Sequence, residues 1–332
     1  MVSLGGTITM TRSGPAGIVP TLTAADLVAS APGIEAVAQL ETVSPMRVAS
    51  ASLAIVELTE LARMLERRLA SDTDGVVVIQ GTDTIEETAW LLDLLVGGDG
   101  PVVVTGAMRG AEAPGADGPA NLLASAIVAG SPQARGLGTL VVLNDQVHAA
   151  RFVQKSHTAL PSAFASPVSG PLGLVAEGSV RFHARLTRTA RLALPEQASN
   201  SPTPPVALLR IGLGDDGRMI GVLPGLGYRG AVIEGAGAGH VPAGLVPLIA
   251  ELAAAMPVVL SSRVSAGPAF TRTYGYPGSE IDLLGRGLLP GGSLGGLKAR
   301  ILLAQLLRSG LEGPALARSF AACTGGIESA GE

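Results

Sequence analysis

Short apolar runs alternate with helical patterns along most of the chain. Apolar runs rich in β-branched residues predict strands at residues 75–81, 101–106, 139–145 and 257–262. Such runs are apolar on both faces, which is typical of strands in a parallel sheet covered by helices. Apolar residues at helical spacing predict helices at residues 55–69, 85–95, 119–129 and 245–255. The alternation predicts an α/β fold with a doubly wound, mainly parallel sheet.

The length of the chain predicts two domains. At 332 residues it exceeds the size at which one hydrophobic core usually keeps growing. Residues 195–205 are rich in proline, serine and asparagine and lack apolar periodicity, which predicts a linker. We therefore expect an N-terminal domain at 1–194 and a C-terminal domain at 206–332. Residues 149–191 carry few helix signals and are predicted to form a hairpin extension.

Composition and charge narrow the classes of function. Hydrophobic residues make up 47% of the chain, but its most apolar long stretch, residues 241–260, contains Pro247, Glu251 and Pro257. We predict a buried helix and strand there, and no membrane segment. The N-terminus lacks the basic and apolar regions of a signal peptide, so a cytoplasmic location is expected. A net charge of −4 without a basic run argues against nucleic acid, and the single cysteine, Cys323, excludes a disulfide framework and a cysteine-rich metal site.

The stretch QGTDTIEETAW, residues 80–90, follows one predicted strand and opens a predicted helix. Thr84, with Glu87 three residues later, fits a capping box at the start of this helix. Thr82 and Asp83 then lie in the turn at the carboxyl end of the strand, where open α/β sheets bind their ligands. A plain capped turn explains Thr84, but it needs neither Thr82 nor Asp83.

A second threonine, Thr7 in SLGGTITM, has the same context of strand end, glycine turn and hydroxyl. One Gly-Gly-Thr turn is more often structural, but two strand-end threonines in one domain favour chemistry. The following loop, residues 9–17, could cover a site as a lid. A threonine hydroxyl needs a base or a cation beside it to act as a nucleophile. Lys155, close to Val153, could accept its proton if the lysine is desolvated, although a solvated surface lysine is the commoner case.

The four histidines do not form an obvious catalytic triad. His148 and His157 are interpreted as polar-loop residues without an obvious carboxylate partner, and His183 and His240 lie far away in the sequence. All four are predicted to be structural or solvent-facing. Amide hydrolysis without histidine remains possible, because a threonine–lysine pair supplies a proton path and glycine turns expose N–H groups to an oxyanion.

The chain resembles the bacterial-type L-asparaginase/glutaminase family of amidohydrolases. The family's motifs occur in its order over nearly the whole chain, and GTDTIEETA is the most specific of them. They are GGTI (5–8), GTDTIEETA (81–89), PVVVTGAMR (101–109), ADGPANL (116–122), LVVLND (140–145), VQKSHT (153–158), SGPLG (169–173) and SSRV (261–264).

The resemblance implies hydrolysis of the side-chain amide of L-asparagine to L-aspartate and ammonia. Thr7 matches the family's usual nucleophile, and Thr82, Asp83 and Lys155 match its Thr-Asp-Lys set. Ser50 matches the serine that binds the substrate α-carboxylate, Asp83 would also hold the α-amino group, and the carbonyl of Ala116 would take the side-chain amide. The implied substrate-binding residues are Gly6, Ser50, Ala51, Gly81, Asp83, Ala116 and Tyr274.

The family's architecture is implied as well. It has a larger N-terminal domain and a smaller C-terminal α/β domain, and it needs no metal or cofactor. It assembles as a dimer of intimate dimers with sites completed across the dimer interface, so a homodimer or homotetramer is expected. The partner is a small molecule, asparagine or glutamine, with no nucleic acid and no membrane.

Several positions depart from the family pattern. The first tyrosine is Tyr228, so the lid lacks the family's tyrosine; Ala51 and Ala238 stand where a glutamine and an asparagine are common. Where many members place an acidic residue that reaches across the dimer, a direct count gives Tyr274, with Glu280 as the alternative. These losses predict a weak, roughly millimolar affinity for asparagine.

The departures also leave alternatives open. A glutaminase or another ω-amidase with a rearranged amino-group pocket is one. A non-catalytic amino-acid-binding or regulatory homologue is another, although binding alone would not need a buried lysine at position 155.

Overall fold

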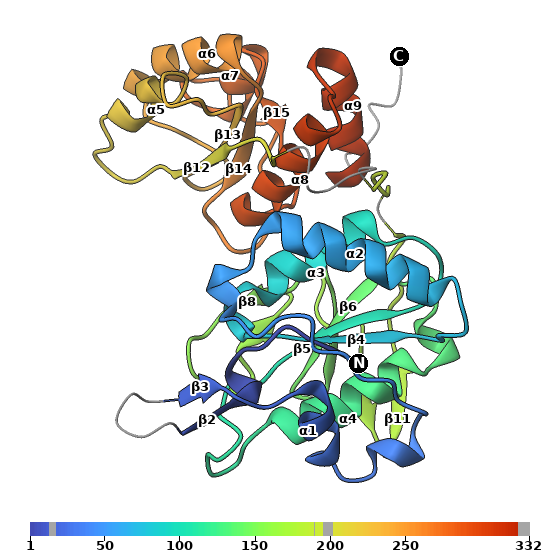
Figure 1. Cartoon of the computed structure of the whole chain (residues 1–332). Helices are drawn as coiled ribbons and strands as arrows, with labels where there is room; N and C mark the ends of the chain where they lie inside the picture. The colour runs from blue at the N-terminus through green and yellow to red at the C-terminus, as the bar shows by residue number, and fades with distance from the viewer. Residues whose placement is uncertain (13–17, 189, 195–201, 325–332) are drawn as a thin grey trace. The chain divides into compact units, whose positions relative to one another are not determined.

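The computed structural model describes residues 1–12, 18–188, 190–194 and 202–324. The chain forms two compact units, Met1–Arg188 and Thr189–Glu332 (Figure 1). This division falls upstream of the predicted linker at 195–205, of which residues 195–201 lie outside the described part of the chain.

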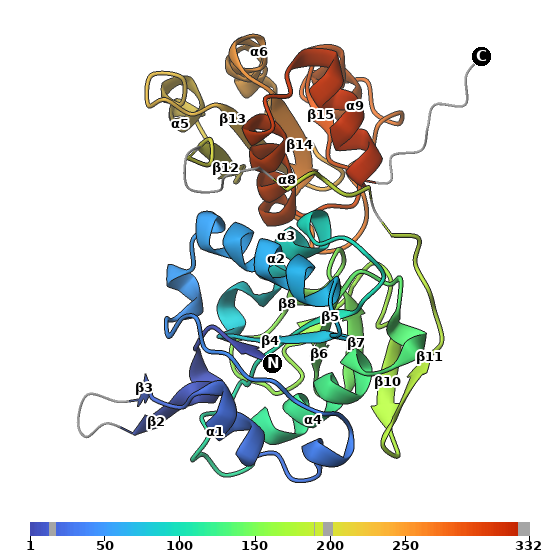
Figure 2. The ribbon, with the colours of Figure 1, turned by 45° about the vertical axis from the view of Figure 1, so that its right-hand side comes forward.

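The N-terminal unit is built on a seven-stranded sheet with the order β1-β4-β5-β6-β7-β10-β11. The first four of these strands run parallel, as the apolar runs predict, and the last three are antiparallel additions. The hairpin of β10 and β11 is the predicted extension, and Figure 2 shows it beside β7. The strands are β1 (Val2–Ser3), β4 (Val76–Ile79), β5 (Val102–Thr105), β6 (Thr139–Leu143), β7 (Gln146–Ala149), β10 (Gly173–Ala176) and β11 (Ser179–Phe182).

Helices cover both faces of this sheet. α2 (Ile55–Leu69) and α3 (Ile85–Leu95) lie on one face, and α1 (Ala24–Ala29) and α4 (Gly118–Ala129) lie on the other (Figures 1 and 2). The bounds predicted for α2 and α3 are confirmed, and α4 begins one residue before its predicted start at 119. The doubly wound arrangement is therefore confirmed for this unit.

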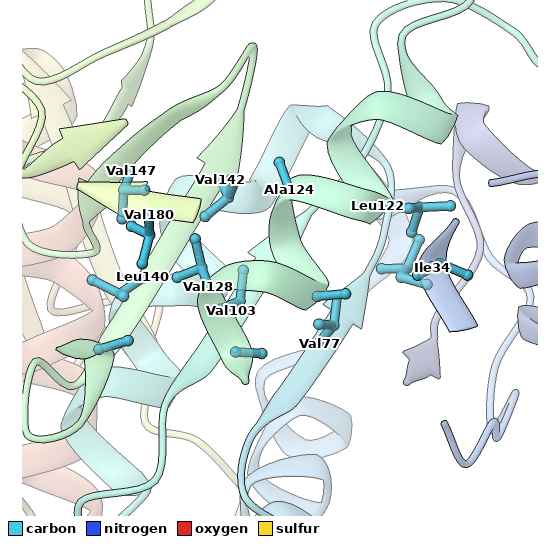
Figure 3. Close-up of a cluster of buried hydrophobic side chains, with 14 of the residues drawn as sticks. Ile34, Val77, Val103, Leu122, Ala124, Val128, Leu140, Val142, Val147 and Val180 are labelled. Atoms are coloured by element: carbon cyan, nitrogen blue, oxygen red, sulfur yellow. The ribbon is translucent and has the colours of Figure 1, made fainter. Parts of the chain in front are cut away.

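The core between the sheet and α4 follows from strand alternation. Val77, Val103 and Leu140 point to the same face, where Leu122 and Val128 of α4 pack against them (Figure 3). Alternate residues of the same strands are also buried, because α2 and α3 cover the other face. The strands are apolar on both faces because helices cover both faces of the sheet.

Two small antiparallel pairs lie outside the main sheet. β2 (Met10–Arg12) pairs with β3 (Ile18–Pro20), and β8 (Gln154–Lys155) pairs with β9 (Phe164–Ala165). The loop predicted at 9–17 therefore contains a strand, and residues 13–17 of that prediction lie outside the described residues.

The C-terminal unit contains a smaller, fully parallel sheet with the order β12-β13-β14-β15. Its apolar stretch at 241–260 forms a helix and a strand, as predicted. The strand is buried, but the helix buries only one face, through Val246, Ile249 and Leu252. The strands are β12 (Val206–Arg210), β13 (Gly230–Gly235), β14 (Val258–Ser262) and β15 (Leu289–Pro290). The helices are α5 (Arg218–Val222), α6 (Val246–Ala255), α7 (Glu280–Gly285), α8 (Gly296–Arg308) and α9 (Gly313–Thr324). None of the helices in the described residues is both long and apolar enough to cross a bilayer.

His148 differs from its predicted place in a polar loop. It lies in β7, is 1% exposed, and its Nδ1 is 3.0 Å from the hydroxyl of Ser166. Burial lowers the pKa of His148 to about 4, because the ring would have to carry its charge without water.

Acid should therefore destabilise the N-terminal unit through His148. Between pH 6.5 and about 4 the unfolded chain binds a proton that the folded chain does not, so the unfolding free energy falls as the pH falls. The free energy of unfolding falls by at most about 3 kcal/mol by pH 4. Thermal unfolding at pH 7 and pH 5 should show a smaller pH difference for His148→Asn than for the wild type. His183→Asn, at an exposed histidine, is the control; equal pH differences in all three proteins would contradict the assignment.

Candidate active site

Two glycine turns touch at the carboxyl edge of the parallel sheet. β1 and β4 are neighbours, and the amide of Leu4 donates to the carbonyl of Ile79 at 2.8 Å. Beyond these strand ends the chain turns at Gly6, with φ +91°, and in the 3₁₀ segment that directly follows the extended residue Gly81. A Cβ atom added at Gly6 would lie 2.0 Å from the amide nitrogen of Gly81, so the two backbones leave no room for a side chain.

Thr7 and Thr82, the two threonines predicted to act in catalysis, therefore follow neighbouring strand ends at one edge of the sheet. Thr7 begins a 3₁₀ turn (Thr7–Thr9), and Thr82 begins another (Thr82–Thr84). The hydroxyl of Thr9 closes the first turn by donating to the carbonyl of Gly6 at 2.7 Å. The two stretches in which a threonine follows a strand end and a glycine thus form a pair of adjoining turns.

Lys155 joins Thr82 and Asp83 at this edge. Its Nζ donates to Thr82 Oγ1 at 2.9 Å and to Asp83 Oδ1 at 2.6 Å. The lysine side chain is 16% exposed and Thr82 is buried, whereas the Asp83 side chain is 68% exposed. In the structure Lys155 Nζ is the donor to Thr82 Oγ1, which leaves the hydroxyl proton of Thr82 for another partner. The three residues predicted to act together are therefore in contact.

Glu86 holds the backbone of Lys155. Its Oε1 accepts the Lys155 amide at 3.2 Å, while β9 pairs with β8 on the other side of the lysine. Ser166, which follows β9, carries the hydrogen bond to His148 of β7. Glu86 lies in the first turn of α3, where a negative charge is favourable. Its hydrogen bond to Lys155 was missed in the sequence, because the two residues lie 69 positions apart.

The predicted capping box at Thr84 and Glu87 is wrong. Thr84 makes no side-chain cap to α3; its hydroxyl instead donates to the carbonyl of Ser50 at 3.0 Å and accepts from Gln80 Nε2 at 3.2 Å. The hydroxyl therefore bonds to distant and neighbouring side-chain and backbone partners and does not accept from the backbone N–H group of α3 that the motif offers. Gln80, which the sequence did not single out, is fully buried directly before Gly81.

Ser50 lies against the second glycine turn. It begins a short 3₁₀ helix (Ser50–Ser52), and a Cβ atom added at Gly81 would lie 2.7 Å from its Oγ. The serine is 3% exposed, and its Oγ has no hydrogen-bond partner among the described residues. Its neighbour Ala51 is exposed and carries no polar group toward the turn. The Ser50 hydroxyl therefore has hydrogen-bonding capacity that no described residue uses.

The loop that carries Ala116 is tied to the same edge. Asp117 accepts from the amides of Met108 and Arg109, at 3.0 and 2.9 Å. Asn121 Nδ2 donates to the carbonyl of Gly106 at 2.9 Å, which fastens α4 to the turn after β5. These bonds give the ADGPANL motif a structural reason, since it links α4 to the strand end.

In the C-terminal unit, Glu280 is held inside its own chain. Its Oε1 accepts from the amides of Thr273 and Tyr274 at 2.8 and 2.7 Å, and its Oε2 lies 3.1 Å from His240 Nε2. Burial acts to raise the pKa of Glu280, but these hydrogen bonds outweigh it and hold the pKa below its ordinary value. Glu280 is fully buried within its own chain, whereas Tyr274 is 41% exposed.

The remaining histidines are structural or exposed. His240 has a carboxylate partner, Glu280, that its distant sequence position concealed, and its Nδ1 is 2.8 Å from the hydroxyl of Tyr276. His157 Nδ1 accepts the amides of Ala159 and Leu160 and closes a local turn. Ala238, in the turn before His240, contributes its carbonyl to the amide of Phe270.

The fold and the cluster of Thr82, Asp83 and Lys155 define an α/β protein with a hydroxyl–amine site at a parallel sheet edge. Comparison with known proteins then identifies the family. The family model "Asparaginase, N-terminal" matches residues 1–188, and "Glutaminase/Asparaginase C-terminal domain" matches residues 205–320. The chain belongs to the asparaginase family of amidohydrolases.

Individual relatives agree with this assignment. The "Probable L-asparaginase" of Deinococcus radiodurans is 38% identical over 308 residues, 87% of each chain. The "L-asparaginase" of Bacillus licheniformis is 34% identical over 277 residues, 83% of this chain and 84% of the relative. A solved structure, "Probable Cytoplasmic L-asparaginase" from Campylobacter jejuni, is 30% identical, covers 97% of this chain and 98% of that chain, and superposes with a TM-score of 0.84.

Gly6→Ala should destabilise the site more than its backbone angle alone explains. The new methyl group would meet the Gly81 backbone, which cannot move aside as a flexible side chain could. Gly33→Ala is the matched control, because Gly33 has φ +83° and nothing within 4 Å of its Cβ position. We expect the control to cost about 1–2 kcal/mol and Gly6→Ala clearly more. Equal shifts in the unfolding temperature would show that the turns do not touch.

Proposed function

We propose that this protein hydrolyses the side-chain amide of L-asparagine to L-aspartate and ammonia. The observation that carries the proposal is the contact of Lys155 Nζ with Thr82 Oγ1 and Asp83 Oδ1, beside the turn that leads into Thr7. A hydroxyl and an amine side by side at a sheet edge can move a proton without histidine or metal. Membership of the asparaginase family supports the same reaction.

The mechanism divides the reaction into two acyl transfers. Thr7 Oγ1 attacks the amide carbon, its proton passes through Thr82 and Lys155, and ammonia leaves with that proton as the C–N bond breaks. Water then attacks the resulting ester, and the released hydroxyl of Thr7 regains a proton. The backbone N–H groups at Gly6 and at the Gly81–Thr82 turn can stabilise the oxyanion.

The ends of the substrate bind to separate groups. Ser50 Oγ takes the α-carboxylate and Asp83 takes the α-amino group, while the carbonyl of Ala116 accepts from the side-chain amide. The unpartnered hydroxyl of Ser50 and the exposed carboxylate of Asp83 support this assignment. Ala51 can add only van der Waals contact, so the affinity stays in the millimolar range expected from the sequence.

Glutamine hydrolysis is the second candidate, because the description of the C-terminal family model names glutaminase as well as asparaginase. We further propose a homodimer or homotetramer in which Tyr274 of one chain approaches the site of another. The exposure of Tyr274 supports such a contact. A cytoplasmic location stays a prediction from the sequence.

Ammonia release from L-asparagine, L-glutamine and their D-forms by the purified protein tests the activity. L-asparagine should be the best of the four, and absence of ammonia from it would refute the proposal. Light scattering on the same sample tests the assembly, which an active monomer would contradict.

Thr7→Val and Thr82→Val should each lower turnover of L-asparagine at least about 10³-fold, because valine keeps the shape and removes the hydroxyl. Thr139→Val is the control. Thr139 is also buried, but it is the first residue of β6 and lies at the amino ends of the parallel strands, away from the site. Near-normal turnover in both site variants would exclude the threonine mechanism.

Lys155→Met should lower turnover about 10²–10⁴-fold while the fold survives. Methionine fills the space of the lysine stem but cannot exchange a proton with Thr82. The Asp83 carboxylate that loses its partner is largely exposed, so the unfolding temperature should change little. A variant with wild-type turnover would reassign Lys155 to a structural role.

A further inference from the structure

Gln80, Thr84 and Ser50 form a continuous bridge behind the second glycine turn. Gln80 Nε2 donates to the carbonyl of Gly81 and to Thr84 Oγ1, both at 3.2 Å, and Thr84 Oγ1 donates to the carbonyl of Ser50 at 3.0 Å. The direction of the bridge is fixed at both ends, because the carbonyls of Gly81 and Ser50 can only accept. The Gln80 amide must therefore present its nitrogen to the turn.

The bridge leaves two buried polar atoms without a partner among the described residues, Ser50 Oγ and Gln80 Oε1. Buried polar groups in native proteins are normally hydrogen-bonded, so an orphaned hydroxyl beside a glycine turn needs a reason. Ser50 Oγ lies 2.7 Å from the Cβ position of Gly81, next to the turn that carries Thr82. A ligand acceptor at this turn would satisfy it.

The segment that carries Ser50 has little regular structure of its own. It is a 3₁₀ helix of three residues whose N-cap, Ala49, offers no side-chain cap. Val48 ties it to the sheet edge through the carbonyl of Leu4 at 3.0 Å, and Thr84 ties it at Ser50 itself. The orientation of the serine hydroxyl therefore depends on the Thr84 contact.

We propose that Gln80 and Thr84 are positioning residues that hold Ser50 Oγ, free of internal partners, for the α-carboxylate of the amino-acid substrate. This role rests on the proposed function, since it requires such a substrate. The α-carboxylate carries the same charge in the ground state and in the transition state, so its contacts contribute uniform binding. Loss of the bridge therefore raises KM and leaves kcat nearly unchanged.

Thr84→Val removes the bridging hydroxyl at constant shape. The fold tolerates the change, because Gln80 Nε2 keeps the carbonyl of Gly81 and the carbonyl of Ser50 keeps the amide of Leu53. KM for L-asparagine should rise about tenfold with kcat within about twofold of the wild type. Thr84→Ser retains the hydroxyl and should restore KM. Thr88→Val is the matched control, one turn along α3, where the buried threonine hydroxyl has no hydrogen-bond partner in the part of the chain that the structure describes.

A double-mutant cycle with Ser50→Ala separates positioning from general damage. If Thr84 acts through Ser50, Thr84→Val should add less than about twofold to KM in the Ser50→Ala background. A full tenfold effect in that background, an equal fall in kcat, an unchanged KM or failure of Thr84→Ser to restore KM would each overturn the proposal. Calorimetry with L-aspartate measures binding without turnover. The dissociation constant should rise for Thr84→Val and return toward the wild-type value for Thr84→Ser.

The two readouts separate the two proposals. Wild-type ammonia release reports on the proposed function, and the ratio of variant to wild-type aspartate binding reports on the bridge. If the wild type binds no aspartate, the positioning role is also refuted.

Discussion

The contact between the backbones of Gly6 and Gly81 is the constraint on which the site depends. Each glycine follows the end of one of two neighbouring parallel strands, and a side chain on Gly6 would overlap the Gly81 amide. A third turn joins them, because a Cβ atom at Gly106 would lie 2.5 Å from the carbonyl of Gln80. Three strand ends are thus packed backbone against backbone, which brings the residues that follow them to one place. The proposed chemistry of the site depends on this close packing.

Lys155 and Asp83 form an ion pair in which the two side chains differ in solvent exposure. The lysine lies mostly covered and touches the buried hydroxyl of Thr82, while the carboxylate faces water. Water screens the exposed carboxylate of this pair, so the pair contributes little stability and the carboxylate can exchange partners readily. The exposure of Asp83 agrees with its proposed role in binding the substrate ammonium group, while Glu86 accepts the backbone amide of Lys155.

Patterns that are local in the sequence predicted the fold well. The helices at 55–69 and 85–95 and the parallel strands follow from periodicity and β-branched runs, because burial on one or both faces imposes these patterns. Local pattern failed where a residue found a distant partner. Thr84 matched a capping box but bonds to Ser50, and His148 resembled a loop residue but is buried in a strand. Glu280 could be taken for a surface acid until its three hydrogen bonds were located.

The central claim is that the two touching turns form one site for an amino acid with a side-chain acyl group. A crystal structure of the protein with L-aspartate bound tests this most directly. The account predicts the α-carboxylate at Ser50 Oγ, the α-amino group at Asp83, and the side-chain carboxylate between Thr7 and Thr82. Aspartate bound elsewhere, or turned so that its side-chain carboxylate points away from both threonines, would contradict the account.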